Sequence, residues 1–237
     1  MTRRPKQAPT VETPAPDADA ILQVKVWLLD VSPMVWRRLL VPSRYTLREL
    51  HGVIQVAMGW EGIHLYDFQL RAARYGSWEL SASSPDVTLV TLRLRKGTRF
   101  VYEYDLNIPW RHEVRIEDWL GPPQAAKTYP LCTGGSGACP PEDCGGPESF
   151  MAGRDDRFSF DALEDLGTMA EIVQRVMVAN GSDTLSDVLD QDTRWRLEDA
   201  LERAKAREAA QGRPFSRRVV NTGLRNDEHH NLMHQQC

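Results

Sequence analysis

The first half of the chain alternates hydrophobic and polar positions with the period of two that is typical of β-strands. Leu22, Val24, Val26 and Leu28 share one face of a first strand. A return strand is expected at residues 36–41, after a turn that contains a proline. The start of the chain therefore predicts a hairpin-like pair of strands.

Further strands are expected at residues 64–70, 87–95, 100–106 and 110–116, with a Lys-Gly hairpin turn between the second and the third. In the last of them, Trp110, His112, Val114 and Ile116 lie on the same side, because successive side chains of a strand point to opposite faces. His112 is therefore predicted to point inward among apolar neighbours.

One helix is marked clearly by its two ends. Thr46 and Glu49 have the spacing of a capping box, in which each side chain satisfies a backbone N–H group at the helix start. The apolar residues between Leu47 and Met58 fall on one stripe, and Gly59 supplies the stop. The spacing predicts a helix over residues 47–58 that packs on the strands.

Beyond residue 155 the pattern becomes helical. Thr168 and Glu171 form a second capping box, ahead of an apolar run that Gly181 ends. Asp192 is the candidate cap of a third helix, which an i,i+4 ion pair supports.

These patterns predict an α+β protein, a strand-rich roll with the capped helix packed on it, followed by a C-terminal helical extension. The expected parts are a disordered tail at residues 1–19, an α+β domain with a Cys-rich loop at 20–150, a helical extension at 151–211 and a loosely ordered tail at 212–237.

Composition and charge exclude some function classes. The first twenty residues lack the apolar core of a secretion signal, and no later run approaches the length of a membrane span. We therefore expect a cytoplasmic protein with no membrane partner. A net charge of −4 gives no overall electrostatic case for nucleic acid.

The candidate chemistry is a cluster of cysteines in a Gly/Pro-rich loop. Cys132, Cys139 and Cys144 lie within thirteen residues of an otherwise cysteine-poor chain, which leaves a metal, a disulfide or a reactive nucleophile. Thiols stay reduced in the cytoplasm, which weighs against the disulfide. A closed zinc site needs four Cys or His ligands, and the inward-facing His112 is the natural fourth. We therefore predict a structural zinc site made by His112, Cys132, Cys139 and Cys144.

Two alternatives stay open for this loop. The cysteines are also explained as small packing residues beside a hydrogen-bonded core histidine, since free cysteine is among the most buried residue types. A nucleophilic cysteine with His112 as its base is the other alternative, but no orienting third group can be identified. Glu142 and Asp143 are interpreted as solvated turn residues.

Two further groups of residues have an ordinary and a functional interpretation. Aromatic and cationic residues alternate around Trp36 and Trp110, as they do on some nucleic-acid surfaces. Strand periodicity favours instead that the tryptophans pack inward while Arg37 and Arg111 point to water. His230 and His234 have the i,i+4 spacing of a helical metal site, but they lie in a polar end and are interpreted as solvated.

Several segments together resemble the plasmid pRiA4b ORF-3-like family, a group associated with plasmids and mobile elements. They are Pro33-x-Val-Trp-Arg-Arg38, Leu47-x-x-Leu-His51, Met58-Gly-Trp60, His64-Leu-Tyr-x-Phe68, Tyr104-Asp-x-x-x-x-Trp-x-His112 and Ala138-Cys-Pro-Pro-Glu-Asp-Cys-Gly-Gly146. The resemblance covers residues 21–150 and implies a compact α+β roll with the capped helix packed on the sheet.

The resemblance implies little about activity. We expect a non-enzymatic interaction module that is stabilised by the Cys/His metal site and acts through a protein or DNA partner. The alternatives are an enzyme that uses a metal or thiol in the Cys132–Cys144 loop, and a DNA-binding accessory of a mobile element.

Overall fold

The computed structural model describes residues 19–77, 79, 81–155, 160–178 and 190–234. These residues form one seven-stranded antiparallel sheet in the order β4-β3-β5-β6-β1-β2-β7. Its strands are β1 (Ile21–Leu28), β2 (Trp36–Pro42), β3 (Tyr66–Leu70), β4 (Ala73–Gly76), β5 (Arg99–Tyr104), β6 (Trp110–Leu120) and β7 (Leu131–Ser136). The predicted first pair is confirmed, because β1 and β2 are antiparallel neighbours.

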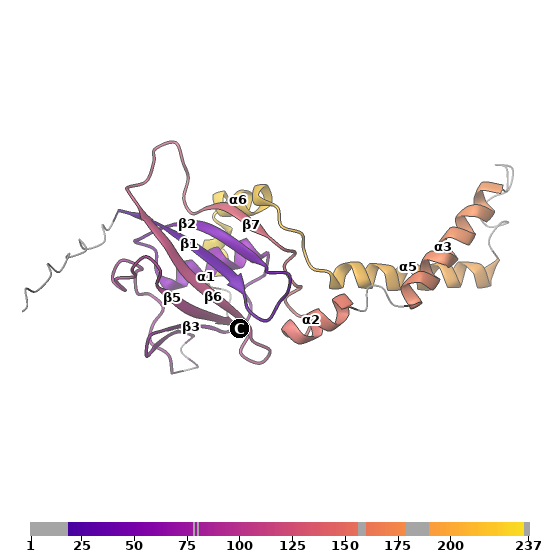
Figure 1. Ribbon diagram of the computed structural model, residues 1–237, viewed down its shortest axis with the longest axis horizontal. Coiled ribbons are helices and arrows are strands. Elements are labelled where there is room, and N and C mark those ends of the chain that lie inside the picture. The colour runs from indigo at the N-terminus through magenta and orange to yellow at the C-terminus, as the bar shows by residue number, and fades with distance from the viewer. Residues whose placement is uncertain (1–18, 78, 80, 156–159, 179–189, 235–237) are drawn as a thin grey trace, which may run out of the picture.

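Helix α1 (Leu47–Met58) lies behind the sheet in Figure 1 and covers one of its faces. Both predicted ends are confirmed: Thr46 and Glu49 form the capping box, and Gly59 ends the helix in the left-handed conformation. The alternating apolar residues of β1 are buried in a common core with the inward face of α1. This arrangement confirms the predicted α+β class.

A small polar network lies inside this core. The side-chain amide of Gln55 donates to the hydroxyl of Tyr102 (2.7 Å), which lies 2.7 Å from Nδ1 of His51. The ring of His51 stacks on that of Tyr66, with centroids 3.8 Å apart. Burial lowers the pKa of His51 to about 3, so this histidine is neutral in the folded protein.

The strand predicted at residues 87–95 is absent from the described structure, where this segment forms turns. Leu89, Leu92 and Leu94 are nevertheless buried. Strand β5 pairs with β3 on one side and with β6 on the other, so it offers no free edge to the segment. The prediction of a strand over residues 87–95 was therefore wrong, although the leucines of this segment are buried.

The segment predicted to be a loosely ordered tail instead forms two helices, α6 (Arg217–Arg225) and α7 (Glu228–Leu232). Val220 and Leu224 of α6 join the core. Asn221 exchanges two hydrogen bonds with the backbone of Cys132 in β7, at 2.7 and 2.9 Å. The apolar stripe of α6 is only two residues long, which explains why periodicity alone did not reveal it.

The remaining helices are α2 (Gly146–Asp155), α3 (Phe160–Val178) and α5 (Gln191–Ala210). Helices α3 and α5 pack on each other and reach away from the sheet as one helical arm (Figure 1). Helix α3 begins eight residues before Thr168, so that residue lies inside the helix and does not cap it. The expected stop at Gly181 lies outside the described residues. Within the described part of the chain, no helix is both long and apolar enough to cross a membrane.

Candidate functional site

The structure places the four predicted zinc ligands on neighbouring but separate parts of the domain. His112 lies near the start of β6 and Cys132 in β7, while Cys139 and Cys144 lie in the loop that leads to α2. Among the described residues, these four do not gather three ligand atoms within 4.8 Å of one another. As placed, they do not form a tetrahedral site, and zinc binding by this loop stays a prediction.

His112 points inward, as predicted, and is packed among aromatic rings. Its Nδ1 lies 3.0 Å from the carbonyl oxygen of Trp110, so that nitrogen carries the proton and donates. The ring meets Trp60 edge-on, with centroids 5.4 Å apart. Burial lowers the pKa of His112 to about 3, and backbone hydrogen bonds offset only part of that effect. His112 is therefore a neutral core residue in this structure.

The three thiols are held in their protonated form. Burial raises the pKa of Cys139 to about 12, although the nearby charge of Arg37 acts in the opposite direction. Burial also raises the pKa values of Cys132 and Cys144. Among the described contacts, Cys132 Sγ donates to the carbonyl oxygen of Gly134 (3.5 Å), and no histidine or carboxylate is hydrogen-bonded to the three thiols.

Arg37 is buried, which contradicts the expectation that it points to water. Its guanidinium donates to four carbonyl oxygens, those of Trp36, Ala57, Ser136 and Gly137, at 2.8 to 3.3 Å. It also stacks on the ring of Phe215, at 4.5 Å from the centroid. The carbonyl of Ala57 belongs to the negative C-terminal end of α1, which stabilises the buried cation. Arg37 thereby joins α1, β7 and the C-terminal segment.

The Cys-Pro-Pro-Glu-Asp segment is held by buried aromatic side chains. The indole N–H of Trp60 donates to the carbonyl oxygen of Pro140 (2.8 Å), and that of Trp110 donates to the carbonyl oxygen of Glu142 (3.0 Å). The hydroxyl of Tyr104 donates to Oε1 of Glu142. We call Trp60, Tyr104, Trp110 and Glu142 the loop clamp. Its members come from three separate sequence motifs, since Tyr104 and Trp110 belong to the same one.

Glu142 is an anchor in this clamp and not a solvated turn residue. Its side chain is only 9% exposed, and its second oxygen accepts the backbone N–H of Glu61 (2.6 Å). Asp143, in contrast, is exposed as expected and pairs with Nε2 of His64 at 3.1 Å. Periodicity does not predict the conformation of this loop. The aromatic residues of the family motifs, Trp60, Tyr104 and Trp110, were the signal in the sequence that could have suggested hydrogen-bond partners for it.

An open pocket of about 790 Å³ separates this loop from the end of the helical arm. Cys139, Cys144 and Glu142 contribute to one wall, and Lys205 and Glu208 of α5 to the other. The chain returns from the arm by pairing with the loop, since the backbones of Cys139 and Arg213 exchange two hydrogen bonds. The clamp therefore fixes the point where the arm joins the domain.

The chain is similar to known proteins in sequence and in fold. The family model described as "Plasmid pRiA4b ORF-3-like protein" matches residues 20–156. An uncharacterized protein, y4hQ, from Sinorhizobium fredii is 36% identical over 138 residues, which are 56% of this chain and 70% of that protein. A crystal structure of a protein of unknown function, MM3350, from Methanosarcina mazei Go1 superimposes with a TM-score of 0.56 at 28% identity, over 60% of this chain and 83% of that one. The chain thus belongs to the plasmid pRiA4b ORF-3-like protein family.

Proposed function

We propose that this protein is a non-enzymatic interaction module whose helical arm pairs with the arm of a second copy. In this proposal the α+β domain is the rigid base and the arm is the contact surface. The observation that carries it is an uncovered apolar stripe along α3. A link to plasmids or mobile elements rests on the family's description alone.

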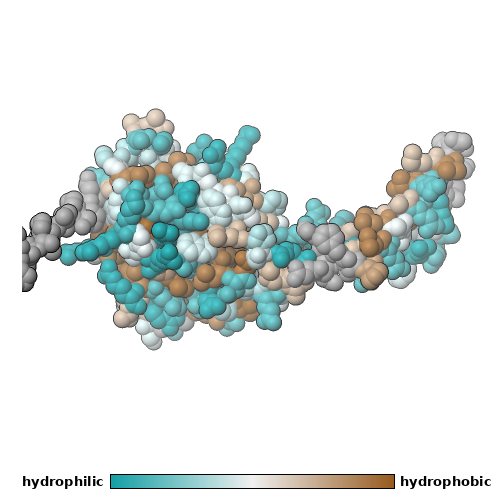
Figure 2. Space-filling model, in the orientation of Figure 1, coloured by the Kyte–Doolittle hydropathy of each residue, from teal (hydrophilic) through white to brown (hydrophobic). Residues whose placement is uncertain are grey.

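The stripe consists of Leu163, Leu166, Ala170, Val173 and Met177, which are spaced alternately three and four residues apart. This is the spacing of the a and d positions in a coiled-coil seam, so the five side chains share one side of the helix. All five are exposed, Leu163 and Leu166 at 62% and Met177 at 76%. Brown, apolar surface is visible on the arm in Figure 2.

The other side of α3 is already occupied by α5. Asp165 and Ile172 are buried there. Arg203 and Arg207 of α5 both bind the carboxylate of Asp165, and Arg203 also pairs with Asp199 one turn away. These contacts hold α5 on its own side of α3, so α5 leaves the stripe uncovered.

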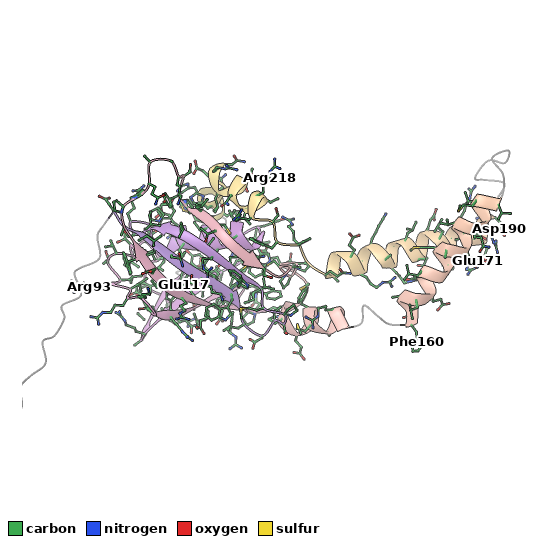
Figure 3. The ribbon with its side chains drawn as sticks, turned by 45° about the horizontal axis from the view of Figure 1, so that its top comes forward. Arg93, Glu117, Phe160, Glu171, Asp190 and Arg218 are labelled. Carbon is green, nitrogen blue, oxygen red and sulfur yellow. The ribbon has the colours of Figure 1, made fainter. Side chains whose placement is uncertain are left out.

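The stripe supplies a substantial part of the area that a stable pair buries. With four of its side chains 57–76% exposed, the stripe and Leu201 of α5 together expose on the order of 450 Å² of apolar side chain, about half of the roughly 800 Å² that each partner contributes to a standard interface. Phe160 adds to this surface at the start of α3, where it is 90% exposed and its side chain points into open space (Figure 3). A second arm offers a surface of the same shape and chemistry, as an isologous contact requires.

The open face of the sheet does not favour a DNA partner. Four cations on and beside this face are paired with carboxylates: Arg38 with Glu117 (2.6 Å), Arg99 with Glu113 (3.1 Å), Arg111 with Asp30 (2.8 Å) and Lys96 with Asp118 (2.9 Å). Lys25 lies instead over the ring of Trp36, 4.9 Å from its centroid. In Figure 3, Glu117 lies over the strands of the sheet. A nucleic-acid surface needs free cations for the phosphates.

The cysteine loop does not favour an enzyme. The thiolate is the nucleophilic form of cysteine, and burial raises the pKa values of all three thiols. The protonated thiols therefore argue against a nucleophilic role for the loop.

The proposal is tested by the mass of the full chain in sedimentation equilibrium. We expect the wild type to be a dimer and the Leu166→Glu/Val173→Glu double variant to be a monomer, because the buried stripe would then carry unpaired charges. Val219→Glu is the matched control, since Val219 is 63% exposed on α6 and lies outside the arm. A wild type that stays monomeric at high concentration, or a dimer that survives the double substitution, overturns the proposal.

The predicted zinc site has its own test. Elemental analysis of freshly purified, reduced protein is expected to find zinc in the wild type and to find less of it in Cys139→Ser. Equal metal content in the two proteins, or none in either, removes the four-ligand zinc site.

A further inference from the structure

A second group of metal-ligating side chains lies where α7 packs on the start of α1. Asp227, His229 and His230 each offer one ligand atom, and these three atoms all lie within 4.8 Å of one another. Within the described residues, three or more His, Cys, Asp or Glu side chains come close enough to share an ion only in this group. It is separate from the cysteine loop.

His229 is the buried member of the group. It is fully buried, and its Nε2 lies 3.2 Å from the hydroxyl of Tyr45. Its Nδ1 is buried as well and has no hydrogen-bond partner among the described residues. A buried nitrogen without a partner is costly, because it has lost its hydrogen bonds to water.

His230 and Asp227 form the accessible side. Nδ1 of His230 lies 3.6 Å from Oδ1 of Asp227, and its Nε2 lies 3.9 Å from Oε1 of Glu49. Both distances are longer than a hydrogen bond. The side chain of Asp227 is 75% exposed, so an ion can reach the group from solvent.

The backbone holds these residues in place. Asp227 has a positive φ of 57°, and this turn directs the chain from α6 into α7. A Cβ at position 52 would lie 2.1 Å from the carbonyl oxygen of His229, so Gly52 is what allows α7 to rest directly on α1. Oε2 of Glu49 accepts the backbone N–H of Thr46, and this capping hydrogen bond holds the Glu49 side chain at the start of α1. Its Oε1 remains turned toward His230.

We propose that Asp227, His229 and His230 bind a divalent transition-metal ion of the zinc type, with Glu49 as an additional oxygen ligand or a partner of His230. Two imidazoles and a carboxylate are a donor set that suits zinc and its neighbours, whereas Mg²⁺ and Ca²⁺ prefer oxygen ligands alone. Two nearby carboxylates supply the negative charge that a divalent cation needs. The bound ion ties the C-terminal helix to the start of α1.

The test is calorimetric titration of metal-free, untagged full-length protein with Zn²⁺. Asp227→Asn and His230→Gln are the informative variants, because both side chains are partly exposed and both changes keep the side-chain size. Loss even of an indirect ligand partner costs about 10- to 100-fold in metal affinity, so each variant is expected to bind Zn²⁺ at least roughly tenfold more weakly. His234→Gln is the matched control, since His234 is exposed and outside the group. It is expected to bind like the wild type.

Titration with Co²⁺ separates this site from the cysteine loop, because bound thiolate gives an intense charge-transfer band in the near ultraviolet that nitrogen and oxygen ligands do not give. We expect the site to fill without that band. Zn²⁺ affinity that is unchanged in both Asp227→Asn and His230→Gln, or Co²⁺ binding only with the thiolate band, overturns the proposal.

Discussion

The α+β domain and the helical arm place their apolar residues in opposite ways. In the domain, Trp60, Tyr104 and Trp110 are buried, and the loop clamp uses their N–H and O–H groups to hold a backbone segment. In the arm the apolar stripe of α3 is exposed, while the carboxylate of Asp165 is buried between the helices. The domain is therefore complete in one chain. The arm becomes complete only when another surface covers it.

The largest expected difference between the two regions concerns one tryptophan in each. Trp110→Ala is expected to lower the free energy of unfolding by about 3–5 kcal/mol, because it empties a fully buried site and frees the carbonyl of Glu142. Trp195→Ala in the arm is expected to change it by less than about 0.5 kcal/mol, since Trp195 is 65% exposed. Urea unfolding followed by circular dichroism measures both. Equal losses would remove the distinction.

Acid should weaken the domain before it weakens the arm. His51 and His112 have folded-state pKa values of about 3, below the ordinary value of 6.5, so the unfolded chain binds more protons as the pH falls from 6.5 toward 3. Each histidine is expected to lower the free energy of unfolding by about 2 kcal/mol between pH 7 and pH 5.

Helices α3 and α5 contain no histidine. Arg203 lowers the pKa of Asp165 below its ordinary 3.8, so the contribution of this ion pair is present above that value and is lost only at lower pH. Urea midpoints at pH 7 and pH 5 provide the measurement. His112→Gln is expected to reduce the pH-dependent loss by about a third, because His229, whose pKa burial lowers to about 4, contributes a loss similar to those of His51 and His112. An unchanged pH dependence in that variant would contradict the account.

A smaller effect separates two neighbouring carboxylates of the clamped loop. Glu142→Gln is expected to cost about 1–3 kcal/mol, because an amide cannot accept two hydrogen bonds with both terminal atoms. Asp143→Asn is the control and should cost less than about 1 kcal/mol, since the His64–Asp143 pair is exposed. Thermal unfolding of the two variants provides the comparison. A larger loss of stability in Asp143→Asn than in Glu142→Gln would contradict the assignment of Glu142 as the anchor of the loop.

The smallest expected effect is on the domain when the arm is changed. Leu166→Glu/Val173→Glu should leave the free energy of unfolding of the domain within about 0.5 kcal/mol of that of a monomeric wild type at low concentration. This quantity is measured by urea unfolding, followed by the fluorescence of the buried tryptophans of the domain. A large loss would mean that the arm folds as one unit with the domain.

Features set by neighbours in the sequence could be predicted. The capping box at Thr46 and Glu49 and the inward direction of His112 follow from helix and strand geometry, and the structure has both. The exposed stripe of α3 could in principle have been found in the same way. The predicted helix began at Thr168, so Leu163 and Leu166 lay outside it. In addition, the sequence does not show which of two apolar faces a neighbour will cover.

Features set by distant partners could not be predicted. Arg37 is buried because its acceptors lie 20, 99 and 100 residues away, which alternation along one strand cannot reveal. Glu142 lies in a loop and is buried because Tyr104, at the end of the distant strand β5, donates to it. The proximity of His229 and His230 to Glu49 likewise depends on how α7 packs against α1.

The central claim is that a second copy covers the apolar stripe of the arm. The most direct measurement is backbone amide hydrogen exchange of the full chain over about a hundredfold range of protein concentration, because exchange reports local opening. The account predicts that protection of residues 163–177 rises with concentration while protection of the strands β1 and β6 stays the same. Protection of residues 163–177 that does not change with concentration, in a chain whose mass also stays that of a monomer, would contradict it.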